Sequence, residues 1–233
     1  MFPAPEQSVE PRVPVWGYED LALFLGGVFP SLAIALGIVR LFKNLPAFSS
    51  SGLTQLVFQS IFYLLLMGVL HIILAWKYQA PFWSSLGCYF DFPYAWRYYV
   101  LGPVLSITLG SLTVLLRPPV TESPIEELIL DRRALILVLL LGPIAEELVF
   151  RGFLYPLLAR SLGPWLGIVA TAIPFALLHG AQSEWTWQLL VPIGVAGIVF
   201  GVVRYVSGST VAAMLVHVGY NSTAVALYLV QKA

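Results

Sequence analysis

Charged side chains are scarce in this chain of 233 residues. Lys, Arg, Asp and Glu together supply 10% of the sequence, whereas hydrophobic residues supply 59%. Soluble domains contain about 25% charged and 45–50% apolar residues, so a soluble single domain is excluded. Twelve basic residues balance twelve acidic ones, which leaves no basic excess for binding nucleic acid.

Cysteine is nearly absent too, because Cys88 is the only one in the sequence. A single cysteine excludes an intramolecular disulfide and a cysteine-based metal cluster. The N-terminus lacks the basic residues and the short apolar core of a signal peptide. Its first twenty residues contain four prolines and mostly acidic charges. We therefore expect residues 1–20 to form a flexible tail.

Apolar runs dominate the rest of the sequence. A helix that crosses a bilayer takes about 20 residues, so the chain has room for six to eight spans and for no second soluble domain. Backbone groups in hydrocarbon must be hydrogen-bonded internally, and these runs are too long for the roughly 10-residue strands of a membrane barrel. The sequence predicts an all-α transmembrane helical bundle, a single membrane domain at residues 21–233. Seven runs are long enough: Leu21–Val39, Leu53–Trp76, Tyr98–Leu116, Ala134–Leu158, Trp165–His179, Leu189–Val203 and Thr210–Val230.

The longest polar segment within the predicted bundle runs from Arg117 to Arg133. Its charged residues alternate with isoleucine and leucine, which is typical of a helix on the membrane surface, although a solvated linker fits equally well. Lys and Arg are shared almost evenly between the two sides of seven alternating spans, so the sequence leaves the membrane orientation open. Besides Arg117 at its start, the charged residues within this segment are Glu122, Glu126, Glu127, Asp131, Arg132 and Arg133.

Three of the predicted spans contain polar residues that hydrocarbon disfavours. A charged group inside a span costs about 2.5–3.5 kcal/mol on insertion scales, so such residues need a reason to be there. The fourth span contains Glu146, Glu147 and Arg151, the fifth ends at His179, and the seventh contains His217 and Asn221.

Helical spacing suggests different roles for the two glutamates. Glu147 and Arg151 are four residues apart on one face, so they can form an ion pair that offsets their insertion cost. Glu146 is rotated by about 100° from Glu147 and has no obvious partner on its own helix. Pro143 has no N–H and frees a carbonyl that another helix or water must satisfy. We interpret Glu147 and Arg151 as supporting residues and Glu146 as a candidate for chemistry.

Polar side chains from three helices can converge around Glu146. His217 and Asn221 lie four residues apart on one helix face, and His179 comes from another span. A carboxylate can act as general base on water, while imidazole and amide groups orient that water or stabilise an oxyanion. Two structural interpretations stay open. The Glu146 region can be a helix end at the membrane interface, and His217 with Asn221 can serve as interhelical hydrogen-bonding groups.

Three motifs carry these residues in order: EELVFR at 146–151, FALLH at 175–179 and HVGYN at 217–221. Together they resemble the CPBP family of intramembrane proteases, also called Abi, which includes the type II CAAX prenyl endopeptidases and bacteriocin-immunity proteins. The family pattern is EExxxR, then FxxxH, then HxxxN or HxxxB. The resemblance extends over residues 134–229, whereas the first three spans are similar only in being apolar.

The resemblance implies an endopeptidase that hydrolyses a peptide bond in a polar cavity within the membrane. In that case Glu146 activates the water with help from His179, and His217 and Asn221 stabilise the oxyanion. Members of the family act on prenylated C-termini or on other peptides. The implied substrate is a CAAX-like, lipidated or bacteriocin-type peptide or membrane protein, and the expected location is the cell membrane.

The sequence leaves two alternatives open: one concerns a zinc cofactor, and the other concerns whether the protein is an enzyme. Glu146, His179 and His217 offer three ligands for an open catalytic zinc site, and members of the family have been called metalloproteases. The sequence has no HExxH motif, and Asn221 suits an oxyanion better than zinc, so we favour a mechanism without a cofactor. The alternative class is a non-catalytic membrane protein, a transporter or an immunity partner, that uses the same polar residues structurally.

Overall fold

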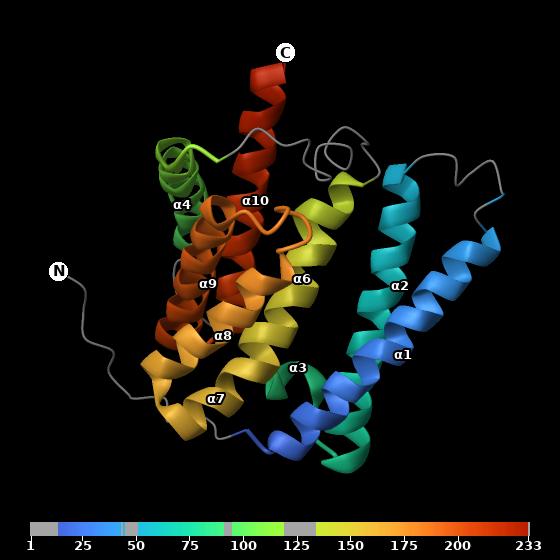
Figure 1. The fold of residues 1–233 in the computed structure, drawn as a ribbon. Coiled ribbons are helices and arrows are strands. Elements are labelled where there is room, and N and C mark those ends of the chain that lie inside the picture. The colour runs from blue at the N-terminus through green and yellow to red at the C-terminus, as the bar shows by residue number, and fades with distance from the viewer. Residues whose placement is uncertain (1–13, 43, 45–50, 91–94, 119–133, 233) are drawn as a thin grey trace.

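The computed structural model describes residues 14–42, 44, 51–90, 95–118 and 134–232, and these residues form helices and connections without a strand. The predicted all-α fold is confirmed. Successive long helices run in alternating directions, and the pair α1 and α2 lies to one side of the others (Figure 1). The elements are α1 (Tyr18–Phe42), α2 (Ser51–His71), η2 (Ile72–Lys77), α3 (Phe82–Ser85), α4 (Ala95–Leu116), η3 (Leu137–Leu141), α6 (Gly142–Glu147), η4 (Leu148–Leu154), α7 (Tyr155–Leu162), α8 (Pro164–Leu178), α9 (Trp187–Ser207) and α10 (Thr210–Lys232), where η denotes a π-helix.

All seven apolar runs are helical, but five of the described helices are long and apolar enough to cross a bilayer. The fifth run forms α8, whose 15 residues span about 22 Å and fall short of a hydrocarbon core about 30 Å thick. The fourth run is helical over residues 135–162, with α6 between the π-helical segments η3 and η4. Segments of π-helix are rare and often mark functional sites. Two of the three described π-helical segments therefore flank the helix that carries the two adjacent glutamates.

Glycine allows two pairs of helices to approach closely. A Cβ added at Gly102 of α4 or at Gly219 of α10 would collide with the backbone of the other helix. On α9, a Cβ at Gly201 would lie 2.8 Å from the side chain of Ile168 on α8, and one at Gly197 would lie 3.0 Å from Phe175. These glycines let α8 and α9 pack closely together.

The packed part of the chain begins before residue 21, where the expected tail ends. Trp16 is buried, stacks on Phe153 and donates a hydrogen bond from Nε1 to the Phe153 carbonyl at 3.0 Å. Asp20 is also buried and accepts hydrogen bonds from Lys77 and Tyr78 at 2.7 and 2.6 Å, which join the start of α1 to the end of η2. Only residues 1–13 of the expected tail lie outside the described residues.

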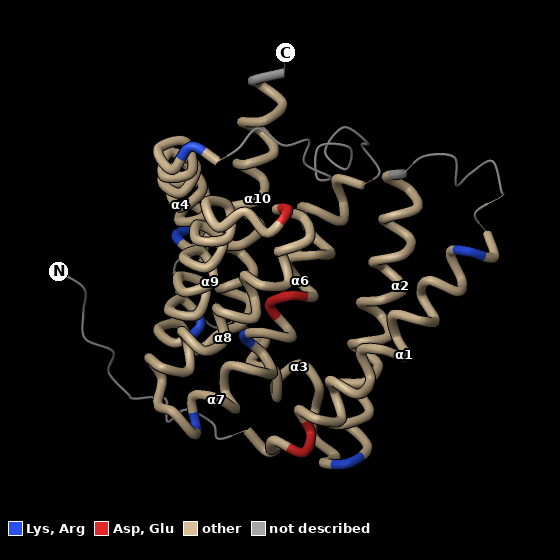
Figure 2. The backbone as a smooth tube through the Cα atoms, viewed as in Figure 1, with Lys and Arg blue, Asp and Glu red and all other residues tan. Residues whose placement is uncertain are grey.

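Charged residues lie mostly toward the two ends of the bundle, with a clear exception around α6 (Figure 2). Figure 2 shows an acidic segment beside the α6 label, inside the bundle and about halfway between its two ends. This segment is the Glu146 and Glu147 pair that ends α6. Residues 119–133, which make up most of the polar segment between the third and fourth runs, lie outside the described residues.

Candidate functional site

A cavity of about 350 Å³ lies where helices from both halves of the chain meet. The residues that line it come from α2, α4, η3, α6, α8, α9, α10 and the loop after α8. Glu146, His179, His217 and Asn221, the four residues predicted to converge, all line this cavity. The structure therefore brings together side chains that are up to 75 positions apart in the sequence.

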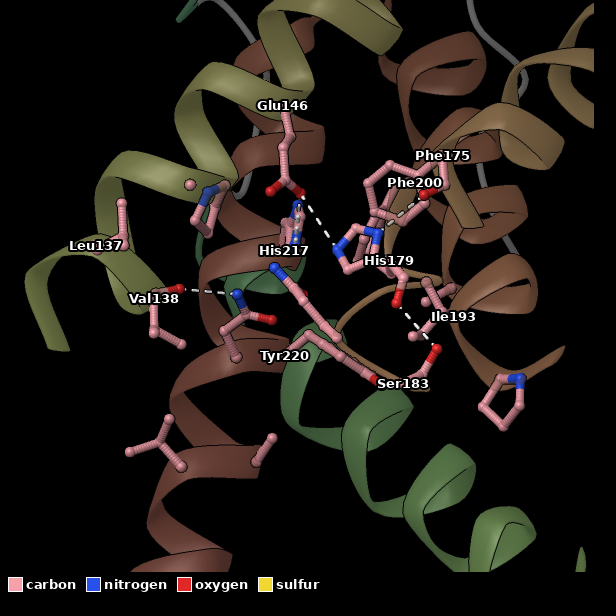
Figure 3. Close-up of a pocket in the computed structure, with 18 of the residues that line it drawn as sticks. Leu137, Val138, Glu146, Phe175, His179, Ser183, Ile193, Phe200, His217 and Tyr220 are labelled. Atoms are coloured by element: carbon pink, nitrogen blue, oxygen red, sulfur yellow. Dashed lines mark hydrogen bonds and ion pairs between the residues drawn. The ribbon is translucent and has the colours of Figure 1, made fainter. Parts of the chain in front are cut away.

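Glu146 lies near the end of α6 with its carboxylate directed into the cavity (Figure 3). Its Oε2 atom lies 3.9 Å from Nε2 of His179 and 3.9 Å from Nε2 of His217. These separations are too long for direct hydrogen bonds, but two atoms 3.9 Å apart can each contact one water at about 2.8 Å. The Glu146 side chain is 21% exposed, so water can reach it.

His179 directly follows the last residue of α8. The last carbonyls of a helix lack backbone donors, and a histidine in this position can satisfy one of them. The Nδ1 atom of His179 lies 2.8 Å from the carbonyl oxygen of Phe175. Because a carbonyl only accepts, Nδ1 must carry a hydrogen, and Nε2 is the atom left facing Glu146.

His217 is held by the second glutamate of the pair. Its Nδ1 lies 2.9 Å from Oε1 of Glu147, and the same oxygen accepts a hydrogen bond from Arg151 at 2.9 Å. Glu147 and Arg151 are fully buried, so the expected ion pair is present. The sequence did not reveal that Glu147 also contacts His217, because that contact joins two different helices. A carboxylate paired with Arg151 is ionised, so it fixes the hydrogen of His217 on Nδ1.

Arg151 also ties the site to α8 and α9. Its guanidinium donates to the carbonyl of Gly197 at 2.6 Å. The guanidinium carbon lies 4.6 Å from the ring centre of Phe175 and 5.3 Å from that of Phe200, within the range of cation–π attraction. Phe200 stacks in turn on the His217 ring at 4.5 Å. The buried Glu147–Arg151 pair thus helps to position Phe175 and Phe200, the aromatic rings beside His217.

Asn221 satisfies a carbonyl that Pro143 leaves free. The N–H of Gly142 bonds to the carbonyl of Leu137, five residues back, in the π-helical register. The next donor in that register would be residue 143, but proline has no N–H for the Val138 carbonyl. Asn221 donates to this carbonyl from Nδ2 at 2.8 Å. The expectation that another helix compensates for Pro143 is met, and one amide hydrogen of Asn221 remains for other partners.

This arrangement predicts that Pro143 orients Asn221. In Pro143→Ala the new N–H would compete for the Val138 carbonyl and release the amide of Asn221. If the protein has the peptidase activity that the motifs imply, we expect peptide cleavage to fall about tenfold, since small misplacements of reacting groups have effects of this order, while the melting temperature stays at or above wild type. Pro30→Ala, in the middle of α1, is the matched control. Full activity of Pro143→Ala would show that Asn221 needs no such restraint.

Tyr63 of α2 is a site residue that the motifs did not reveal. Its hydroxyl lies 3.4 Å from Oε1 of Glu146 and 3.5 Å from Oε1 of Gln59, one helical turn away. Both residues line the cavity. A signal is present in the sequence, because Gln55, Gln59 and Tyr63 form a polar stripe at four-residue spacing in an otherwise apolar run.

Among the described residues, neither Ser183 nor Cys88 has the surroundings of a catalytic nucleophile. Ser183 lines the cavity, but its hydroxyl donates to the backbone carbonyl of His179 at 2.9 Å rather than to an imidazole (Figure 3). Cys88, in the loop after α3, is not among the residues that line the cavity. Burial raises the pKa of the Cys88 thiol to about 11, although the charge of Arg204 acts in the opposite direction. A thiol with so high a pKa is not activated.

The side chains around Glu146 are of types that bind zinc, but their spacing is wide. Ligands about 2.0–2.2 Å from a tetrahedral zinc ion lie about 3.3–3.5 Å apart. The carboxylate–imidazole separations here are 3.9 Å. The described residues contain no group of three or more His, Cys, Asp or Glu side chains arranged to hold a metal ion. The geometry suits a bridging water better than a tetrahedral zinc ion.

Comparison with known proteins identifies the part of the chain that carries this site. Residues 129–223 match the family model described as type II CAAX prenyl endopeptidase Rce1-like. No curated protein and no solved structure matches the chain. The three motifs lie within the matched residues, and the family's general activity is proteolysis of peptide substrates in a membrane. The predicted resemblance is confirmed over residues 129–223, which match the Rce1-like model of type II CAAX prenyl endopeptidases, and the long apolar helices indicate an integral membrane protein.

Proposed function

We propose that this protein is an intramembrane endopeptidase in which Glu146 activates a water molecule. One observation carries the proposal. The Glu146 carboxylate oxygen lies 3.9 Å from Nε2 of both histidines, and the other nitrogen of each ring is held by Phe175 or Glu147. The two fixed rings and the partly exposed Glu146 carboxylate define a place for one water, within reach of Glu146 as general base.

Charge balance supports a specific protonation state. The cluster contains two carboxylates, Glu146 and Glu147, and one guanidinium, Arg151, so one further positive charge would neutralise it. His217 is the better candidate to carry that charge, because it contacts the ionised Glu147 at 2.9 Å. His217 then has a hydrogen on Nε2 to donate, whereas neutral His179 presents a lone pair that accepts a hydrogen from the water.

The reaction follows from these assignments. Glu146 removes one proton from the water as the water oxygen attacks the carbonyl carbon of the scissile peptide bond. The negative charge that develops on the carbonyl oxygen is stabilised by Nε2–H of His217 and by the remaining amide hydrogen of Asn221. Glu146 then gives its proton to the departing amine, and the carbon–nitrogen bond breaks to leave a carboxylic acid and an amine.

The position of the cavity favours a substrate that reaches the interior of the membrane. Apolar residues such as Leu189, Ile193 and Val225 line the cavity beside the polar cluster. Such a lining accommodates apolar side chains or a lipid chain attached to a peptide. We propose a CAAX-like, lipidated or bacteriocin-type peptide or membrane protein as the substrate, and a multi-pass location in the cell membrane.

A peptide-library assay tests the proposed function. Purified protein in lipid nanodiscs is incubated with lipidated and unlipidated peptides, and the products are identified by mass spectrometry. We expect cleavage at defined bonds by wild type and none by Glu146→Gln. Binding of peptides without cleavage by either protein would instead support the alternative, a non-catalytic membrane protein that uses the same polar residues.

The metal-free mechanism makes a separate prediction. The wide spacing of the histidines and Glu146 leads us to expect substoichiometric zinc by elemental analysis of active enzyme. Activity should persist after prolonged dialysis against a strong chelator. Complete loss of activity that zinc alone restores would overturn the metal-free mechanism and would assign Glu146, His179 and His217 as zinc ligands.

A further inference from the structure

We propose that Tyr63 is a positioning residue that holds the Glu146 carboxylate in its productive orientation. This inference rests on the proposed function and adds a helix that the family match does not include, since α2 lies outside residues 129–223. The site would then consist of two parts. The reacting side chains lie within residues 129–223, and Tyr63 on α2 restrains the Glu146 carboxylate.

The two oxygens of Glu146 have different neighbours. Oε1 lies 3.4 Å from the hydroxyl of Tyr63, and Oε2 lies 3.9 Å from Nε2 of each histidine. A hydrogen bond from Tyr63 to Oε1 would therefore fix the rotation of the Glu146 carboxylate. That rotation directs Oε2 toward the water between the two histidines. The Tyr63 contact is longer than an ordinary O–H···O bond of about 2.5–3.0 Å. Hydrogen bonds in unliganded active sites are often long and shorten when substrate binds.

The hydroxyl hydrogen of Tyr63 has a preferred direction. The hydroxyl lies between two side chains, Glu146 and Gln59, but it has only one hydrogen to donate. A carboxylate is a stronger acceptor than an amide, so the hydrogen belongs on the Glu146 side. The amide of Gln59, with its oxygen and nitrogen exchanged, can then donate to the phenolic oxygen. The result is a directed chain from Gln59 through Tyr63 to Glu146.

Packing alone does not account for these two side chains. Most of α2 is apolar, and the candidate span Gly52–Lys77, which includes nearly all of it, has a window of mean hydropathy 2.2. Polar groups in such a helix are costly unless they face a cavity or a partner, and Gln59 and Tyr63 do both. Their neighbours on α2 that face elsewhere, such as Phe62 and Leu64, are hydrophobic.

Kinetics of Tyr63→Phe test the proposal. The substitution removes one hydroxyl and keeps the ring, so it should leave peptide binding intact while the carboxylate loses its restraint. We expect kcat to fall about tenfold, the effect of losing one hydrogen bond to a charged group, with KM changed less than about twofold. Tyr205→Phe on α9, which is 45% exposed and does not line the cavity, is the matched control and should keep wild-type kinetics. Unchanged kcat, or a raised KM at constant kcat, would overturn the positioning role.

A second measurement does not depend on activity. Melting temperatures are compared for wild type, Tyr63→Phe, Glu146→Gln and the double variant. If Tyr63 bonds the Glu146 carboxylate, the two substitutions should be non-additive, with Tyr63→Phe having less effect once Glu146 is a glutamine. Additive shifts would overturn the contact. An inactive wild type with non-additive shifts would refute the proposed function and still leave Tyr63 bound to Glu146.

Discussion

Glu146→Gln is expected to abolish proteolysis while the protein still folds and melts near the wild-type temperature. Glutamine keeps the volume of the side chain but cannot take a proton from water, and general base catalysis contributes about 10²–10⁴-fold to rates. Stability should survive because Tyr63, His179 and His217 lie 3.4–3.9 Å from the Glu146 carboxylate, so no short hydrogen bond to them is lost. The cleavage rate on the best library peptide and the melting temperature are the two measurements.

Glu126→Gln is the matched control for this experiment. Glu126 starts the other Glu-Glu dipeptide of the chain, within the polar segment between the third and fourth apolar runs. The same chemical change at that position should leave the cleavage rate unaltered. A loss of less than tenfold in Glu146→Gln would move the role of general base to another residue.

The fold could be predicted because a membrane restricts a chain to few solutions. Long apolar runs must be helices there, and each of the seven runs is helical. The finer shape could not be predicted, because it depends on tertiary contacts. Hydropathy alone does not show that 137–141 and 148–154 are π-helical. Nor does it show that Trp16 is buried against Phe153, which extends the packed part of the chain toward the N-terminus.

The site was predictable where its residues share a helix face or a motif. The spacing of Glu147 and Arg151 predicted their ion pair. Glu146, His179 and His217 were identified because polar groups inside a membrane span carry a free-energy cost and therefore need a reason to be there. The individual hydrogen bonds between helices were not predicted. The bond from His217 to Glu147 depends on how α10 lies against α6, which spacing along one helix does not encode. Tyr63 escaped for the same reason, since the helix α2 that carries it is far from the motifs in sequence.

Neutralising either member of the buried ion pair is expected to destabilise the protein strongly. Glu147 and Arg151 have side chains that are at most 1% exposed, so removing one leaves the other as a buried charge without its counter-ion. Broken buried pairs typically cost about 3–5 kcal/mol. We expect Arg151→Met and Glu147→Gln to lower the melting temperature and the yield of folded protein. The measurement is thermal unfolding in the same detergent or nanodisc for each variant.

The two variants should differ in how activity changes once folded protein is compared at equal amounts. Arg151 supports Glu147 and contacts Gly197, Phe175 and Phe200, so folded Arg151→Met should retain part of the wild-type kcat. Glu147 also holds His217 at 2.9 Å, so folded Glu147→Gln should lose more, because the ring is no longer fixed with its hydrogen on Nδ1. The opposite result is informative as well. If Arg151→Met melts normally but cleaves nothing, Arg151 takes part in the chemistry itself, and the separation between a catalytic Glu146 and a supporting pair is wrong.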